Sequence, residues 1–322
     1  MKYFTILLSV FFLSISLLSA RIITVDNRPG AQYQTLSQAI SATQEGDTVL
    51  VMGSEKVYDN INITKNRVTV IGPGYFLDEN IGFQANINPA QVGQVTFNPG
   101  TVESVVQGLY ITKGVSMYGK KCILERNYVS GSTSGGGGVR VENQQDSCII
   151  RQNYINTSSS FTTLFGGSNT IYIYNNYIKA SILNIEAQSG EIYNNVINTN
   201  TSIMNINYYN NIQISGNFTA PNVIPYNNIG NSIQYGSTNG NQSNVDMASV
   251  FTNDSSSTDD QYLLNPAGPA VGAGFGGIDC GMFDDSFGYK YILSGIPAIP
   301  SIYEFSSDAA LENVTIKVRS NL

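Results

Sequence analysis

The chain has 322 residues, of which 12% are charged, and its formal net charge at neutral pH is −7. This charge argues against nucleic acid, heparin and anionic lipid as partners, because an acidic surface attracts none of them. The chain contains no histidine. That absence excludes Ser-His-Asp and Cys-His catalysis, as well as any metal centre that depends on imidazole ligands.

The first 20 residues have the features of a secretory signal peptide. Lys2 supplies a positive charge, the stretch 4–18 is apolar, and small residues end at Ala20, which predicts cleavage before Arg21. The apolar stretch is shorter than the roughly 20 residues that a membrane span needs. An uncleaved membrane anchor is the alternative. We therefore predict a secreted or cell-surface protein, with no membrane-spanning segment once residues 1–20 are removed.

Residues 21–46 are predicted to form an N-terminal cap. A short amphipathic helix is indicated by residues at i, i+3, i+4 and i+7 spacing, namely Leu36, Ala39, Ile40 and Thr43. Thr35 followed by Gln38 is a capping-box start, and Gly46 is predicted to end the helix. We expect this helix to cover one end of the domain that follows it.

Five segments of the following region share a pattern that aligns on one asparagine. Examples are Cys-Ile-Leu-Glu-Arg-Asn-Tyr-Val at 122–129 and Ile-Tyr-Ile-Tyr-Asn-Asn-Tyr-Ile at 171–178. The shared residues are Asn127, Asn153, Asn176, Asn195 and Asn217, at spacings of 26, 23, 19 and 22. A period of roughly 22 residues predicts a solenoid with one coil per repeat. We expect these asparagines to stack as a structural ladder at a bend where Asn tolerates a left-handed backbone.

Within each repeat the residue pattern has a period of two, which indicates strands. Leu124 and Ile150 belong to a predicted inward column, whereas Glu125 and Arg151 belong to the outward column beside it. We therefore predict an all-β fold, a single-stranded right-handed parallel β-helix over residues 47–265. It has a short N-terminal capping helix and a C-terminal β-rich cap. The glycine-rich stretch 130–146 is expected to be a loop that projects from the rod.

Residues 266–322 differ in composition from the repeats. Glycine and proline become dense from Pro266, and a strand-like segment follows at 313–319. An open end of a parallel solenoid exposes strand edges, which proteins generally cover. This tail is therefore predicted to be a C-terminal cap, and an attachment module is the alternative.

The chain resembles secreted bacterial right-handed parallel β-helix repeat proteins of the pectin-lyase-like superfamily. The opening of that superfamily is matched by Tyr33–Ile40, Glu45–Val51 and Val68–Gly74, and a closing signature by Asp260–Gly274 with Ile278–Phe283. The resemblance implies the same architecture and a bacterial, extracellular or periplasmic location. It implies little about activity, because this fold hosts lyases, hydrolases, esterases, adhesins and surface proteins.

Two enzyme classes of that superfamily lack their motifs here. The chain has neither the Gly-His-Gly segment and paired aspartates within a coil of polygalacturonases nor the aspartate segments and Arg-Pro-Trp of pectin methylesterases. Ca²⁺-dependent polysaccharide lyase chemistry, a β-elimination, stays open, with Arg140, Arg151, Glu142 and Asp146 as candidate catalytic residues. The alternative for Arg151 is a salt bridge to Glu125 on the preceding coil, which we favour.

No metal site or cofactor is predicted from residue spacing, although Ca²⁺ stays open. The loop 252–260 is rich in oxygen-bearing side chains that could hold Ca²⁺ weakly, and a solvated acidic loop is the favoured interpretation. The three cysteines are Cys122, Cys148 and Cys280. Cys122 and Cys148 are expected one coil apart, as a disulfide or, in the favoured interpretation, as small apolar residues.

Twenty tyrosines and no tryptophan form an unusual aromatic composition. Predicted columns of tyrosine run along the rod, one with Tyr128, Tyr154 and Tyr177 and an outward one with Tyr174 and Tyr193. These residues are the candidate substrate-binding surface for polysaccharide, although like residues also stack simply to stabilise parallel sheets. We expect a non-catalytic, secreted or surface β-helix that contacts polysaccharide along the solenoid face. The alternatives are the lyase and a structural or adhesive surface rod.

Overall fold

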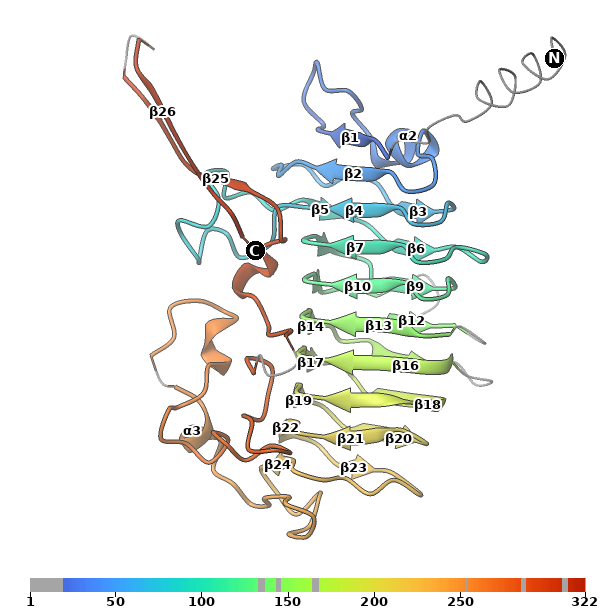
Figure 1. Cartoon of the computed structure of the whole chain (residues 1–322), viewed down its shortest axis with the longest axis vertical. Helices are drawn as coiled ribbons and strands as arrows, with labels where there is room; N and C mark the ends of the chain where they lie inside the picture. The colour runs from blue at the N-terminus through green and yellow to red at the C-terminus, as the bar shows by residue number, and fades with distance from the viewer. Residues whose placement is uncertain are drawn as a thin grey trace, which may run out of the picture.

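The repeats fold into coils that stack along one axis, as the period of the sequence predicts (Figure 1). This arrangement is seen in a computed structural model, which describes residues 20–132, 137–142, 146–163, 168–252, 254–284, 288–308 and 312–321. The strands of successive coils pair in parallel. Three parallel sheets, which we call A, B and C, run along the stack. Each complete coil passes through them in the order B, A, C before the chain enters the next coil. The fold is the parallel β-helix that the repeats predict.

The three sheets are built from short strands. Sheet A contains β1 (Ile22–Val25), β2 (Thr48–Val51), β4 (Thr69–Ile71), β7 (Val105–Gln107), β10 (Ile123–Glu125), β13 (Cys148–Arg151), β16 (Ser168–Tyr174), β18 (Leu183–Tyr193) and β21 (Asn207–Tyr209). Sheet B contains β3 (Ile61–Ile63), β6 (Val95–Phe97), β9 (Val115–Met117), β12 (Gly137–Val141), β15 (Ser160–Thr163), β20 (Thr201–Met204) and β23 (Phe218–Thr219). Sheet C contains β5 (Gln91–Val92), β8 (Tyr110–Ile111), β11 (Tyr128–Val129), β14 (Tyr154–Asn156), β17 (Tyr177–Lys179), β19 (Val196–Asn198), β22 (Ile212–Ser215) and β24 (Ile229–Gly230). Strand β18 is long enough to pair in both sheets A and B.

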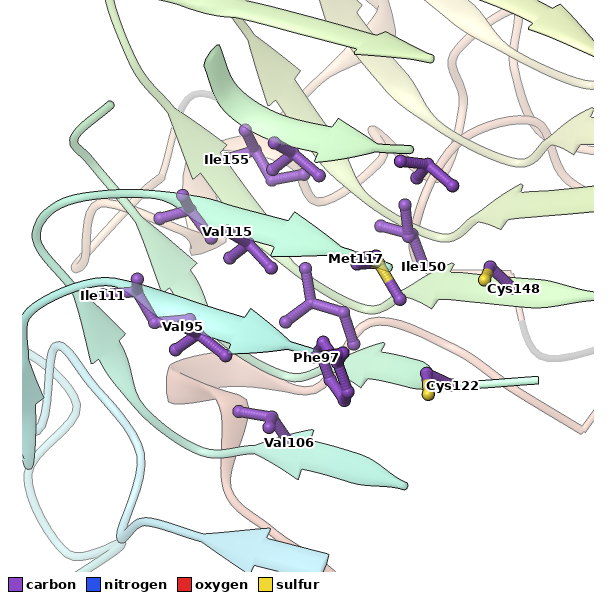
Figure 2. Packing of buried hydrophobic residues seen from close by; sticks show 14 of the residues in the cluster. Val95, Phe97, Val106, Ile111, Val115, Met117, Cys122, Cys148, Ile150 and Ile155 are labelled. Atoms are coloured by element: carbon purple, nitrogen blue, oxygen red, sulfur yellow. The ribbon is translucent and has the colours of Figure 1, made fainter. Parts of the chain in front are cut away.

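The interior of the rod is filled by the inward residues of all three sheets. Figure 2 shows Phe97 and Met117 from sheet B pointing into the same core as Ile150 from sheet A. Because strand side chains alternate between faces, each short strand gives the core one or two apolar residues and turns the rest outward. The stretch predicted to be a projecting loop contains strand β12, so part of that prediction is wrong. Val139 and Val141 of β12 are inward core residues.

An asparagine ladder crosses the turn between sheets A and C. Asn176 shows the pattern of each rung: its Nδ2 donates to Ile150 O and Tyr174 O at 2.9 Å, and to Asn195 Oδ1 at 3.0 Å. Its own Oδ1 accepts from the backbone N–H of Asn153 at 2.9 Å. The described ladder consists of Asn127, Asn153, Asn176, Asn195, Asn211, Asn228 and Asn241. Each rung therefore satisfies buried backbone groups of its own coil and of its neighbours.

The prediction that Asn217 belongs to this ladder is wrong, because Asn211 occupies that rung. Asn217 is exposed, and its backbone N–H donates to Asn200 Oδ1 at 2.9 Å instead. Two neighbouring segments have the residue pattern of a strand, β21 in sheet A and β22 in sheet C. The sequence alignment used the second segment, which placed Asn217 instead of Asn211 on the ladder. Asn211 follows Asn195 after 16 residues, which is a shorter coil than the period of the earlier repeats suggests.

The left-handed backbone at this turn belongs to the residue before each ladder asparagine, which also differs from the prediction. The φ angles are 54° at Arg126, 56° at Gln152, 53° at Asn175 and 52° at Asn194. The ladder asparagines are free to point inward because the preceding residue makes the bend. The side chains of that preceding column point away from the core and matter for the C-terminal segment described below.

The predicted N-terminal helix is present as α2 (Leu36–Ser41). Thr35 caps it by accepting from the backbone N–H of Gln38, and Leu36, Ala39 and Ile40 are buried. The helix ends at Ser41, with Ala42 rather than Gly46 at its C-terminus. The segment before the helix is not only a cap, because β1 pairs in parallel with β2 and thus extends sheet A.

The C-terminal β-rich element is an antiparallel hairpin of β25 (Ser301–Ser307) and β26 (Val314–Arg319). Figure 1 shows that it lies beside the first coils, because the chain after β24 runs back along the side of the rod. This returning segment also contains the short helices α3 (Met247–Val250), η1 (Asp260–Tyr262) and η2 (Leu293–Gly295). In the part of the chain that the structure describes, no helix is long and apolar enough to cross a membrane.

The three thiols are free and buried. Cys122 and Cys148 occupy one inward column of sheet A on adjacent coils, as the favoured interpretation predicts. Burial raises the pKa of Cys122 to about 11 and that of Cys148 to about 12, and it also raises the pKa of Cys280. Because the thiolate is the reactive form, these groups should be inert in the folded protein.

We therefore expect a thiol reagent such as Ellman's reagent to label none of the three cysteines in the native protein, and all three once the chain is unfolded without reductant. The increase in absorbance on adding denaturant measures both states. Labelling of one thiol after unfolding, rather than three, would show that two of them form a disulfide.

Candidate functional site

The tyrosine column on sheet C is largely covered, which argues against the binding surface predicted there. Tyr154 and Tyr177 are 3% and 2% exposed. The Tyr177 ring is stacked between Tyr154, at a centroid distance of 4.6 Å, and Tyr262 of the C-terminal segment, at 4.4 Å. Tyr128 is half-buried, and its ring packs against that of Phe76 at a centroid distance of 5.0 Å. The column points outward from sheet C, but other parts of the chain cover it.

The C-terminal segment that covers sheet C is held in place by the residues that make the bend between sheets A and C. Arg126 donates to Ile296 O at 3.1 Å, and Gln152 donates to Lys290 O. Further along the rod, Asn175 donates to Met282 O and Asp284 O, both at 3.0 Å. Asn227 donates to Ala273 O at 3.0 Å. We call the described residues between 273 and 296, namely 273–284 and 288–296, the strap, because successive coils bind successive parts of it in reverse order.

The strap is also tied to the early coils by a buried carboxylate. Asp259, which is 0% exposed, accepts from Asn80 Nδ2 at 3.0 Å, Tyr291 Oη at 3.0 Å and the Ser294 N–H at 2.7 Å. Burial raises the pKa of this carboxyl and the hydrogen bonds that it accepts lower it; burial has the larger effect, so the pKa lies above its ordinary value. Tyr291 in turn is hydrogen-bonded to Tyr75 at 2.8 Å. Sequence reasoning placed Asp259 in a solvated acidic loop, whereas the structure makes it a structural anchor.

The second aspartate of that loop is held by hydrogen bonds within the chain. Asp260 accepts from the backbone N–H groups of Ser256 at 2.8 Å and Ser257 at 3.0 Å, so this carboxylate is also engaged internally. Across the described ranges, no group of three or more Asp, Glu or Cys side chains could hold a metal ion.

The second tyrosine column lies on the outer face of sheet A. Tyr174, Tyr193 and Tyr209 stack nearly parallel, with centroid distances of 4.8 and 5.1 Å. Their residues are 5%, 8% and 7% exposed. A sugar ring packs on the face of an aromatic ring, and here neighbouring rings cover those faces. Tyr174 and Tyr193 are thus placed on an outward column as predicted, but they stack on each other and leave little ring surface for a ligand.

Arg151 forms the predicted salt bridge with Glu125. Its guanidinium contacts Glu125 Oε2 at 2.5 Å, donates to Tyr174 Oη at 3.1 Å, and lies 4.0 Å above the Tyr289 ring. Burial lowers the pKa of Arg151, but Glu125 and Tyr174 raise it by more, so that the net pKa is above its ordinary value. A base must lose its proton, and this environment therefore opposes the role of Arg151 in proton abstraction.

The other lyase candidates do not join Arg151. Arg140 lies on β12 of sheet B and contacts Glu142 at 3.2 Å, whereas Arg151 lies on β13 of sheet A. Burial, together with the negative charge of Glu142, raises the pKa of Tyr118. Asp146 is half-buried and accepts from the Ser147 hydroxyl at 3.2 Å. The pair of Arg140 with Glu142 and the pair of Arg151 with Glu125 therefore lie on two different sheets, and Asp146 lies just before β13.

Sequence reasoning missed a polar column on the outer face of sheet B. Thr96, Ser116 and Arg140 are register partners on adjacent coils, and Thr162 and Asn184 continue the column. The complete described column is Asn62, Thr96, Ser116, Arg140, Thr162, Asn184, Ser202 and Thr219. Ser116 is buried and the others are half-buried or exposed. The signal in the sequence was the uncharged polar residue between two apolar ones, as in Ile61-Asn62-Ile63.

Comparison with known proteins gives no further assignment. No family model matches this chain, and no curated protein matches it. What is established is a mostly β protein with long parallel sheets in stacked register. Its function has to be argued from the faces of the rod.

A groove at the N-terminal end is a different kind of surface. Its volume is about 1010 Å³, and it lies between the first coils and the base of the hairpin β25–β26. Met52, Ile302 and Phe305, which are 43%, 46% and 59% exposed, are among its lining residues. A hydroxyl-rich ligand needs many polar partners, so this mostly apolar groove suits it less well than the column on sheet B.

Proposed function

We propose that this protein is an exported, non-catalytic β-helix of the pectin-lyase-like kind that contacts an extended polysaccharide along sheet B. The observation that supports the proposal is the polar column on sheet B. Apart from the buried Ser116, its residues present a hydroxyl, amide or guanidinium group on successive coils, at the spacing of parallel strands, about 4.8 Å. A ligand that repeats along its length can bond to such a surface many times. The net charge of −7 favours a neutral polymer over a strongly anionic one.

The faces of the other two sheets support this choice. The outer face of sheet C packs against the returning C-terminal segment, and the tyrosines of sheet A stack on one another. The binding surface proposed here is therefore different from the tyrosine columns that the sequence suggested. Asn184, an exposed residue with register partners Thr162 and Ser202, lies towards the C-terminal end of the sheet B column.

Retention of the protein on a panel of insoluble and immobilised polysaccharides tests the proposal. We expect binding to at least one neutral polymer, and the double variant Asn184→Ala/Ser202→Ala should weaken it about tenfold, because two hydrogen bonds of about 0.5–1.5 kcal/mol each are lost. Asn207→Ala is the matched control, since Asn207 is an exposed outward asparagine on sheet A. Equal loss in both variants would reject sheet B as the surface, and no retention on any polymer would reject polysaccharide binding.

The same panel separates the alternatives. A lyase would release unsaturated products that absorb in the ultraviolet, in a reaction that chelation of Ca²⁺ stops. Arg151 is paired with Glu125, and Arg140 with Glu142, so the surroundings of these two arginines do not favour this reaction. A structural or adhesive rod would attach to cells or proteins without competition from soluble polysaccharide.

A further inference from the structure

Hydrogen bonding in sheet A starts at Arg21, which is also the residue that would become the N-terminus after the predicted cleavage. Thr48 N–H donates to Arg21 O at 2.8 Å, so the pairing of β1 with β2 begins at Arg21. The preceding residue, Ala20, is exposed. The small-residue pattern ending at Ala20 and the start of the sheet are independent observations, and both mark the Ala20–Arg21 peptide bond.

A buried carboxylate lies against the backbone nitrogen of Arg21. Asp47 Oδ1 accepts from Arg21 N at 2.9 Å, and the Asp47 side chain is 1% exposed. The other oxygen, Oδ2, accepts from the Gln44 N–H at 2.8 Å and contacts the Arg21 guanidinium at 2.6 Å. The Arg21 Nε also donates to both oxygens, at 3.4 Å to Oδ1 and 3.2 Å to Oδ2, so that one carboxylate holds both the backbone nitrogen and the side chain of Arg21.

We propose that Asp47 is a binding site for the α-ammonium group that removal of the signal peptide creates at Arg21. This inference rests on the export signal that is part of the proposed function. In the processing step a signal peptidase adds water across the Ala20–Arg21 bond, so that Ala20 leaves as a carboxylate and Arg21 retains a protonated amine. An ammonium N–H then takes the place of the amide N–H, and its hydrogen bond to the Oδ1 carboxylate becomes a bond between two ions.

Charge makes this contact stronger than the one in the unprocessed chain. The amide of the unprocessed chain already donates to a charged carboxylate, and processing adds the attraction between two opposite charges. The Arg21 side chain already holds the pKa of Asp47 at about 2, against the cost of burying the carboxyl, so Asp47 is charged across the neutral range. The pKa of Asp47 is lowered on folding, so the stabilisation from its carboxylate is lost as the pH falls through the acid range towards 2. The stabilisation from the ammonium group is lost at the other end, as the pH rises above the pKa of the α-amine, ordinarily about 8.

The location of the mature N-terminus is the first test. The chain should be expressed with its export signal, and the N-terminal peptide of the exported protein should be identified by mass spectrometry. We expect Arg21. A different first residue, or an unprocessed chain, rejects this inference at its processing step. Polysaccharide retention is measured separately on the same sample, so that the failure of one proposal does not hide the outcome of the other.

The second test compares two chains that differ by one residue, released from a cleavable fusion to begin at Arg21 or at Ala20. At pH 7 the chain that begins at Arg21 should unfold at least about 2 °C higher, and the difference should disappear near pH 10 as the amine loses its proton. It should also disappear in the Asp47→Asn background. Equal midpoints at pH 7, or a difference that persists at pH 10, overturn the proposal even if Asp47→Asn does not fold.

Discussion

Replacing Asn176 with alanine is expected to lower the free energy of unfolding by at least about 3 kcal/mol, because it leaves several buried groups without partners. These groups are Ile150 O and Tyr174 O, which lose the Asn176 amide, and the Asn153 backbone N–H, which loses its acceptor. Asn176 is 0% exposed, so water cannot replace these bonds without entering the core. Urea unfolding followed by circular dichroism measures the effect.

Asn217→Ala is the matched control for this experiment. The same side-chain atoms are removed, but Asn217 is exposed and lies outside the ladder. Its effect should be within about 0.5 kcal/mol, as for most surface substitutions. Comparable losses in the two variants would contradict the ladder as described here, and would place Asn217 rather than Asn211 on the fifth rung.

Tyr177→Ala is expected to cost about 3–5 kcal/mol, the range for deletion of a buried aromatic side chain. Tyr177 is stacked between two rings and is 2% exposed, so the deletion leaves a cavity between sheet C and the returning chain. The C-terminal segment should then become sensitive to proteases in the native protein, because one side of its packing is lost. Polysaccharide retention by the folded variant should be unchanged.

The control for Tyr177 is Tyr172→Ala, which removes the same atoms from a half-buried outward position on sheet A. Its cost should be below about 1 kcal/mol. If Tyr177→Ala instead abolished retention while leaving stability intact, the sheet C column would be a binding surface after all, and the C-terminal segment would have to leave it in solution.

The local pattern of the sequence predicted the coils well, because a coil is a local structure. The alternation around Asn153 and Asn176 determines which residues face the core, and that is decided by neighbours one or two positions away. The error at Asn217 has the same origin. Where two adjacent segments both alternate, the pattern alone does not say which asparagine meets the rung below, and only the contact between Asn195 and Asn211 decides it.

The covered face could not be predicted in this way. Tyr154 reads as an outward residue in its own coil, and it does point outward. Its burial depends on contacts between residues far apart in sequence, such as Tyr75 with Tyr291, which are 216 positions apart. No periodicity links such positions. The binding residues proposed from the sequence were therefore on the correct faces of their strands, but those faces were occupied by other parts of the same chain.

The strap has a consequence for how this protein can change its length. A simple solenoid gains or loses a coil at little cost, because each coil contacts only its neighbours. Here Arg126, Asn175 and Asn227 bind the strap at Ile296, Met282 and Ala273, so that the strap is matched to the number of coils beneath it. Removing one coil would put every later contact out of register. Duplications and deletions of a coil in the middle of this rod should therefore be tolerated only together with a compensating change in the length of the strap. The length of the strap thus determines how many coils the rod can have.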